Sequence, residues 1–291
     1  MQEILQYIFS GITSGAIYAV IAVGFSMLYN ATDLINFGHG EFVMLGALSL
    51  VTLWGGLKLP LPVAFLLSMG IVAVVGFLFE RLAIRPVSKP QPIVLVIITV
   101  GASIFFRGVA MLIWGKDAHS VPQFTSLEPF DILGAKLLPQ SIWIVLISIL
   151  LVLGLYQFYR RTLTGKAMQA TAISKKAAWL TGIPTGKMVM LAFILSSSMG
   201  AVAGVIIAPI TMSSYDMGTM LGLKGFCAAM LGGLGSLWGA LIGGLILGIL
   251  ESLGVGLFFS GVKDAIAFFL LLLILYIKPE GLFGTAKVKR F

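Results

Sequence analysis

Polar residues that interrupt apolar sequence near the start of the chain are the first candidates for chemistry. The stretch Asn30–Glu41 lies between two apolar arms and contains the polar residues Asn36, His39 and Glu41, with the aromatic Phe37 among them. Ionisable and amide groups at membrane depth are costly, so they usually face a cavity or a partner. One interpretation is that these residues line or gate a solute path. The other, compatible with it, is that Asn36 or the nearby Asp33 caps a broken helix by accepting from free backbone amides.

A second break falls in the last third of the chain, inside the apolar segment Leu221–Leu253. Since Met188–Met212 begins inside and the basic tail should also lie inside, an even number of crossings must separate them. We therefore expect this segment to split into a re-entrant pair or two short crossings at its glycine-rich centre: Gly232, Gly233, Gly235 and Ser236. Paired breaks in two halves point to a transport path. The alternative is that both breaks are ordinary loops.

Other isolated charges have more local interpretations. Arg107 lies seven residues before Trp114, about 10 Å from the outer interface at about 1.5 Å rise per residue. Its side chain either snorkels outward or meets the carboxylate of a solute at the outer mouth. The neighbours Glu80–Arg81 and Lys263–Asp264 are expected to pair with each other at the membrane surface.

No arrangement of residues indicates catalysis or a metal site. The sequence has no GxxxxGK followed by Ser or Thr, no paired His and Cys at metal-ligand spacing, and no GxSxG. We therefore expect a protein that is not an enzyme, with no catalytic residue, no metal and no cofactor bound to this chain. If ATP drives the protein, another chain must bind it.

The elements that position these residues must be membrane helices. Hydrophobic residues make up 59% of the chain and charged residues 10%, with a mean hydropathy of +1.06. The apolar segments are long and nearly free of charge, which favours helices over barrel strands. We expect one all-α, polytopic membrane domain over residues 1–291, with about eight spans, some of them broken or re-entrant. The expected apolar segments are Ile8–Tyr29, a short helix to about Trp54, Leu61–Ala83, Ile93–Trp114, Ser141–Tyr159, Met188–Met212, Leu221–Leu253 and Ala265–Ile277.

The net charge of +8 is explained by topology rather than by nucleic-acid binding. Short basic loops stay on the cytoplasmic side. Trp54, Trp114 and Trp143 then fall at outer ends, and the first 57 residues, which lack Lys and Arg, place the N-terminus outside. Thirteen of the 19 basic residues lie in three places: Arg81, Arg85 and Lys89; the segment 160–187; and Lys278, Lys287, Lys289 and Arg290.

The longest polar interruption, Arg160–Lys187, has six basic residues and no acidic one. Within it, Gly165–Leu180 is rich in Ala, Lys and Met, which favours a helix, and Gly182 and Pro184 supply the stop. A helix held at the inner face between two spans can pass a push from a cytoplasmic partner into the bundle. The alternative is a solvated loop that only sets topology.

Three strings carry a resemblance that covers nearly the whole chain. They are GAIYAVIAVGFSMLYNATDLINFGHGEFVMLGA (Gly15–Ala47), GKAMQATAISKKAAWLTGI (Gly165–Ile183) and LGGLGSLWGALIGGLILGILE (Leu231–Glu251). Together they resemble the branched-chain amino acid type of ABC-transporter permease, and more closely its shorter, LivH-type subunit. The combination of NFGHGEF with LGGLGS is specific, whereas neither string would be so alone.

The resemblance implies a permease subunit of a bacterial inner membrane that imports amino acids, most closely the branched-chain ones. Its implied partners are a second homologous permease, two cytoplasmic ATPases that use ATP and Mg, an extracytoplasmic solute-binding protein and the lipid bilayer, with no nucleic acid. The loop implied to dock in the ATPase cleft comprises Gly165, Lys166, Ala167, Gln169, Ala170, Ala178, Gly182 and Ile183. The chain departs from the family pattern in this loop. Gln169 stands where the family commonly has an Arg, and Ser174, Lys175 and Lys176 stand where the family usually has acidic or amide residues.

Two alternatives stay open at this point. The same fold serves relatives that import urea, short amides or other amino acids. From a different class, the protein would be an autonomous channel or an ion-coupled carrier. A coupled carrier would place ionisable groups deep in the bundle, whereas here they are expected near the ends of the spans.

Overall fold

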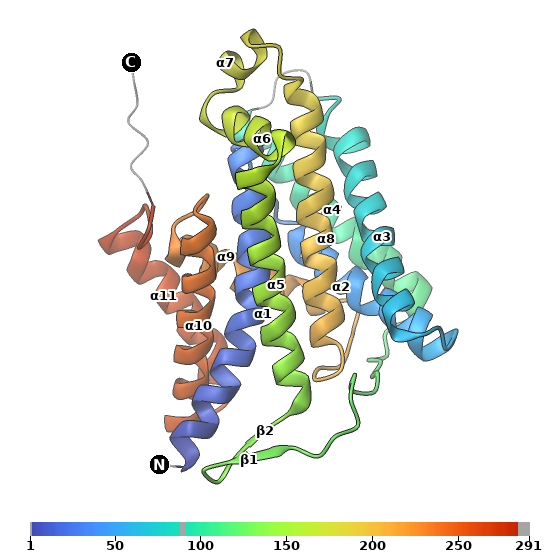
Figure 1. Cartoon of the computed structure of the whole chain (residues 1–291), viewed down its shortest axis with the longest axis vertical. Helices are drawn as coiled ribbons and strands as arrows, with labels where there is room; N and C mark the ends of the chain where they lie inside the picture. Colours follow the sequence, from blue (N-terminus) through green and yellow to red (C-terminus); the bar gives the residue numbers. More distant parts are fainter. Residues whose placement is uncertain (1, 88–90, 285–291) are drawn as a thin grey trace.

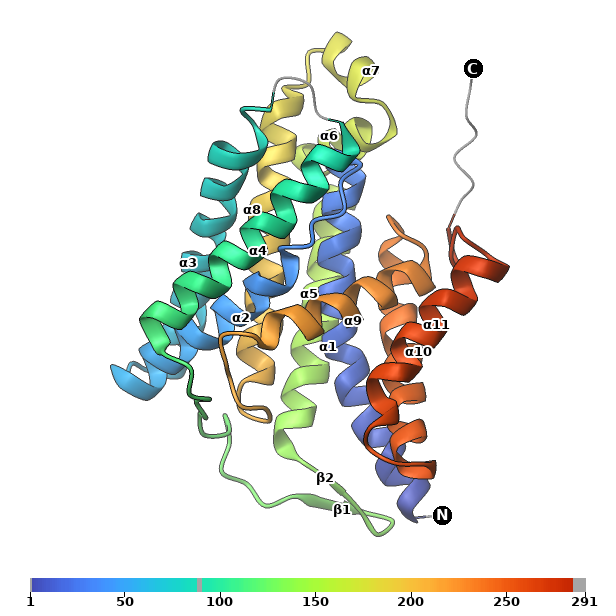
Figure 2. The same cartoon turned by 180° about the vertical axis from the view of Figure 1, so that it is seen from behind.

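Helices account for nearly all of the regular structure. The computed structural model describes residues 2–87 and 91–284, and six of its helices are long and apolar enough to cross a membrane. The predicted all-α, polytopic membrane fold is confirmed, while the number of crossings stays a prediction. The helices and strands (Figures 1 and 2) are α1 (Gln2–Thr32), α2 (His39–Leu50), the π-helical η1 (Val51–Gly56), α3 (Leu61–Phe79), the π-helical η2 (Glu80–Ile84), α4 (Pro92–Trp114), β1 (Phe130–Ile132), β2 (Ala135–Leu137), α5 (Pro139–Arg161), α6 (Leu163–Ile173), α7 (Lys175–Leu180), α8 (Thr185–Ile207), α9 (Met217–Gly232), α10 (Leu237–Leu257) and α11 (Val262–Ile277).

The two ends of the bundle differ as the charge pattern predicts. The basic helices α6 and α7 lie at one end in Figure 1, and the N-terminus and the β1–β2 hairpin lie at the other. Trp114 and Trp143 belong to the hairpin end, where Trp143 Nε1 donates to Thr125 Oγ1 at 2.8 Å. The arrangement is consistent with the prediction that the α6–α7 end faces the cytoplasm, which stays a prediction. Four basic residues of the topology argument lie outside the described residues: Lys89, Lys287, Lys289 and Arg290.

Helix α1 runs through the centre of the bundle and packs closely on α10. No Cβ fits at Gly15 or Gly248, because each lies against the backbone of the opposite helix. Small residues allow this approach in lipid, where packing rather than the hydrophobic effect holds helices together. Helix α1 also lies against α5, α8 and α9, so it occupies the middle of the bundle (Figure 1).

Both predicted breaks are present. After Thr32 the chain is not helical through residue 38, and α2 begins only at His39. The second break is a turn between α9 and α10, in which Gly233 and Gly235 have φ of 105° and 92°. Such left-handed backbone favours glycine, which explains the composition of the turn. Helix α9 begins at Met217, four residues before the expected start of its apolar segment.

The basic segment is not a single helix, so that expectation was wrong. It breaks at Ser174, where α6 ends and α7 begins, because the Ser174 side chain accepts from Ala177 N at 3.2 Å and caps a new helix. The predicted stop is confirmed, since Gly182 has φ of 85°. The two-stranded hairpin within the polar stretch 116–140 was not predicted at all.

Candidate functional site

Helix α6 lies across the inner end of the bundle. The Thr162 side chain accepts from Gly165 N at 2.9 Å and caps the helix. Gly165 sits against the backbone of Phe158 and Tyr159 at the inner end of α5, with no room for a Cβ. The glycine therefore sets how closely α6 approaches α5, and a larger residue would move the helix.

Helix α7 is tied to the end of α1. The Lys175 ammonium donates to the Thr32 carbonyl oxygen at 2.8 Å. Thr32 is the last residue of α1, where unpaired carbonyls and the helix dipole favour a cation. This hydrogen bond therefore joins α7 to the point at which α1 ends and the broken segment 33–38 begins.

The predicted coupling residues differ in how deeply they are buried in the protein. Gly165 and Ala178 are buried, and the others are half-buried or exposed: Lys166, Ala167, Gln169, Ala170, Gly182 and Ile183. The sequence analysis missed the apolar residues that the same helices expose: Leu163 (87%), Ile173 (87%), Trp179 (67%) and Leu180 (69%). Their apolar character in a segment assigned to the cytoplasm was the available signal.

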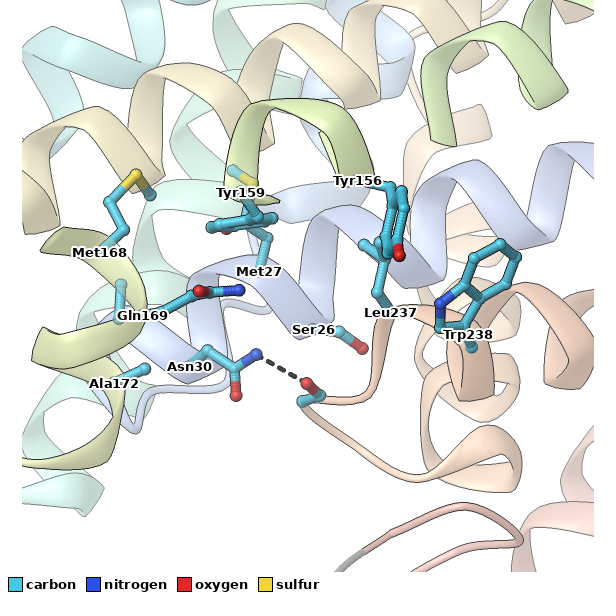
Figure 3. Close-up of a pocket in the computed structure, with 12 residues that line it drawn as sticks. Ser26, Met27, Asn30, Tyr156, Tyr159, Met168, Gln169, Ala172, Leu237 and Trp238 are labelled. Carbon is cyan, nitrogen blue, oxygen red and sulfur yellow. Dashed lines mark hydrogen bonds between the residues drawn. The ribbon is translucent and has the colours of Figure 1, made fainter. Parts of the chain in front are cut away.

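A cavity of about 280 Å³ joins the coupling segment to the second break (Figure 3). Gln169 of α6 and Gly235 of the α9–α10 turn both line it. Between them, Asn30 near the end of α1 donates to the Gly235 carbonyl oxygen at 2.6 Å (Figure 3). Two sets of residues predicted separately therefore meet at one place.

A local turn shapes the first break. Asn36 Oδ1 accepts from Gly38 N at 3.0 Å, as in an Asx turn, so Asn36 does accept from a backbone amide, but no side chain caps α2, whose N-cap is Gly38. Phe37 N donates to Thr99 Oγ1 of α4 at 3.3 Å. His39 is fully buried, with its Nδ1 3.1 Å from Ser196 Oγ of α8. His39 thus packs between helices, and its role in a solute path stays a prediction.

Glu41 lies at the centre of a polar cluster formed by α2, α4 and α9. Its side chain is 1% exposed. Glu41 Oε1 accepts from Ser103 Oγ at 2.7 Å and from Thr219 Oγ1 at 3.3 Å. Arg107 Nε lies 3.7 Å from the same oxygen, so the guanidinium forms an ion pair without a hydrogen bond at this nitrogen. We call Glu41, Ser103, Arg107 and Thr219 the Glu41 cluster.

Two helix N-termini meet at the Glu41 carboxylate. Glu41 is in the first turn of α2, and its Oε2 lies against Gly218, the second residue of α9. The N-terminal end of a helix carries partial positive charge, which stabilises an anion buried there. The N-terminus of α9 therefore contributes to the Glu41 cluster, while the C-terminus of α9 enters the turn at Gly235.

The structure corrects the interpretation of Arg107 as an outward-snorkelling residue. Its side chain turns toward Glu41, and 34% of it is exposed. The sequence contained the signal, namely one Arg within an apolar helix, but the partner is far away in the chain.

A second polar cluster, partly buried, connects α1, α9, α10 and α11. Lys224 Nζ lies 2.9 Å from Glu251 Oε1 and 2.7 Å from Asp264 Oδ1. The Tyr18 hydroxyl donates to Glu251 Oε2 at 2.8 Å. We call these four residues the Lys224 cluster. Lys224 was not among the residues predicted from the sequence, and Glu251 had no predicted role.

Three expectations about charge were wrong, two of them because of the Lys224 cluster. Ionisable groups do not lie only near the ends of spans, because Lys224 and Glu251 are buried in the bundle. Asp264 pairs with Lys224 and not with the adjacent Lys263. Among the described residues, buried Glu80 also makes no salt bridge to Arg81. Packing between helices, rather than sequence proximity, selects the partners.

Known proteins resemble the chain over nearly its full length. Residues 7–275 match the family described as branched-chain amino acid transport system, permease component. The high-affinity branched-chain amino acid transport permease BraD of Pseudomonas aeruginosa is 33% identical, over 98% of this chain and 97% of that protein. The LivH permease of Escherichia coli K12 is 34% identical over the same shares of the two chains. A probable LivH permease of Methanocaldococcus jannaschii is 31% identical over 93% of this chain and 90% of that protein.

Proposed function

Because the chain belongs to the family of permease components of branched-chain amino acid transport systems, we propose that it is the membrane-spanning subunit of an ATP-driven importer of leucine, isoleucine and valine. ATP is hydrolysed by two separate cytoplasmic subunits, and a receptor delivers the solute from outside. A second, homologous permease completes the path. The observation that carries the proposal is that α6 and α7 contact both breaks. Lys175 of α7 bonds to Thr32 before the first break, and Gln169 of α6 shares a cavity with Gly235 of the second.

The exposed apolar residues of α6 and α7 support an ATPase as the cytoplasmic partner. Ile173, Trp179 and Leu180 project from a segment that also presents several lysines. Apolar side chains exposed to the cytoplasm favour burial in a partner's cleft. The lysines around them suit an acidic rim on that cleft.

Two connections lead from this face to the Glu41 cluster. One runs from Lys175 through Thr32 and along the segment 33–38 to α2. The other runs from Gln169 through Asn30 and the Gly235 turn along α9. Since the N-termini of α2 and α9 both lie beside the Glu41 carboxylate, closure of the ATPases would move these two helices relative to each other there.

The ion-coupled carrier keeps one observation in its favour, the pairing of buried Lys224 with Glu251 and with the half-exposed Asp264. Coupling would require that cluster to exchange a proton or ion with water. Its short contacts leave Lys224 paired with two carboxylates, which fits a fixed structural connection better.

Reconstitution tests the proposal. The permease is placed in liposomes with its homologous permease, the ATPases and the receptor, and uptake of labelled leucine is followed with and without ATP. We expect uptake only when ATP and receptor are both present. Leucine uptake by the permease alone would favour the autonomous carrier, and uptake of urea in preference to leucine would favour the amide importer.

A variant pair locates the coupling face in the same assay. Ile173→Glu should reduce co-purification of the ATPases and uptake by tenfold or more, since a charge would be buried in the interface. Leu127→Glu introduces the same charge at an exposed apolar residue outside α6 and α7 and should change neither. Equal effects of both variants would contradict the assigned docking face.

A further inference from the structure

A small cavity beside the Glu41 cluster has the composition of a solute site. It has a volume of about 170 Å³ and lies between α1, the segment 33–38, α4 and α9. Helices α4 and α9 lie on the near side of the molecule in Figure 2. A closed cavity of about 150 Å³ holds benzene, so this space fits a solute the size of a small amino acid. Its main lining residues are Phe25, Phe37, Ser103, Arg107, Thr219 and Phe226.

Arg107 supplies this cavity with donors that the protein leaves unused. Among the described residues the guanidinium makes no hydrogen bond, and its nearest anion, Glu41 Oε1, is 3.7 Å from Nε. An arginine within the span is costly unless its donors are satisfied. Its planar fork matches a carboxylate, which it binds through two parallel hydrogen bonds. A solute carboxylate would therefore complete the contacts that Glu41 leaves open.

The hydroxyls of Ser103 and Thr219 are oriented as acceptors. Each hydroxyl has one proton, and both protons are donated to Glu41 Oε1. The remaining lone pairs are then free to accept hydrogen bonds from a solute. An ammonium group, which only donates, is the matching partner. Glu41 thus acts as a positioning residue that directs both hydroxyls and Arg107.

Three phenylalanines form the apolar wall. The Phe226 ring centroid lies 6.0 Å from that of Phe25 and 5.9 Å from that of Phe37. Aromatic walls with a few placed polar groups are typical of small-molecule sites. This wall offers an aliphatic side chain an environment without hydrogen-bond partners.

We propose that this cavity binds a free α-amino acid during translocation. The carboxylate lies on Arg107, the ammonium group lies on Ser103 and Thr219, and the aliphatic side chain lies against the three phenylalanines. This inference rests on the proposed function and adds to it a site inside the permease, where selection would otherwise belong to the receptor alone. Urea and sugars have no anion for Arg107 and are excluded.

Binding to the complete transporter in nanodiscs, without receptor, tests the site. Labelled leucine is competed with leucinamide, which lacks the carboxylate, and with 4-methylpentanoate, which lacks the ammonium group. We expect wild type to prefer leucine to both. In Arg107→Gln the affinity for leucine should fall roughly tenfold to a hundredfold, as for lost hydrogen bonds to a charged group. The preference over leucinamide should disappear.

Two further variants make the result specific. Thr219→Val should reduce the preference for leucine over 4-methylpentanoate while the preference over leucinamide remains. Lys116→Gln removes a positive charge just beyond the outer end of α4 and should leave both preferences unchanged. Assembly is checked by basal ATP hydrolysis, and Arg107→Lys replaces Arg107→Gln should the latter fail to assemble.

The outcomes separate the two proposals. Unchanged affinity and unchanged preferences in both Arg107→Gln and Thr219→Val, in a transporter that imports leucine, would overturn the site and leave the proposed function standing. A wild-type transporter that neither binds nor imports a branched-chain amino acid would overturn both.

Discussion

The Glu41 cluster and the Lys224 cluster both bury charge among apolar helices, yet they differ in how completely that charge is paired. Lys224 contacts two carboxylates at 2.7 and 2.9 Å, whereas the shortest Arg107 contact to Glu41 is 3.7 Å. The Lys224 side chain is 4% exposed, and the Arg107 side chain is 34% exposed. The Lys224 cluster joins four helices, whereas the Glu41 cluster leaves Arg107 donors facing a cavity. Charge within the bundle therefore has two roles, and the distance between the paired groups tells them apart.

The largest effect is expected from breaking the Lys224 cluster. Lys224→Met leaves Glu251 buried without its cation, and removal of one partner from a buried pair costs about 3–5 kcal/mol. Thermal unfolding of the purified protein should show a large loss of stability. The double variant Lys224→Met/Glu251→Gln should regain much of it, since no uncompensated charge remains near Tyr18. A stable single variant would mean that the cluster is not a structural connection.

A smaller effect on stability is expected from the matching change in the Glu41 cluster. Arg107→Met removes a contact of 3.7 Å from a partly exposed side chain, so the loss should be about 1 kcal/mol or less. The two helix N-termini continue to stabilise Glu41. Thermal unfolding measures this loss of stability as well. A loss as large as that of Lys224→Met would mean that the two clusters contribute to stability in the same way.

The smallest effect on stability, with a clear effect on coupling, is expected at Lys175. Lys175→Ala removes a cation from the C-terminus of α1, which is worth about 0.3–1 kcal/mol. Because this contact is the connection from α7 to the segment before Glu41, less solute should be imported per ATP hydrolysed. Lys176→Ala, at the adjacent exposed lysine, is the control. Identical transport ratios in the two variants would contradict the connection.

Local chemistry explains what could be predicted from the sequence. Glycines at Gly182, Gly233 and Gly235 marked turns because left-handed backbone is a property of the residue itself. Asn36 could be expected to accept from a nearby backbone amide because its partner, Gly38 N, is only two positions away. The positive residues of 160–187 predict an orientation without any knowledge of packing, and that orientation stays a prediction.

The partners within the two clusters could not be predicted in this way. Ser103 and Glu41 are 62 positions apart, and Tyr18 and Glu251 are 233 positions apart. The sequence around each of these residues does not show which helix will pack against it. Lys224 was still detectable as an isolated charge in an apolar segment, and such a residue is a candidate site by default.

Alkylation of two cysteines on α9 compares the clusters in a single molecule. Native Cys227 is buried in the core, one helical turn from Lys224 on α9, and Thr219→Cys adds a second thiol in the Glu41 cluster. The complete transporter is treated with a small charged thiol reagent, with and without leucine, and each site is quantified by mass spectrometry. The account predicts that the thiol at position 219 reacts, that leucine slows this reaction, and that Cys227 stays unmodified. Equal reactivity of the two thiols, or no protection by leucine in a transporter that imports it, would contradict the assignment of the Glu41 cluster to the solute path.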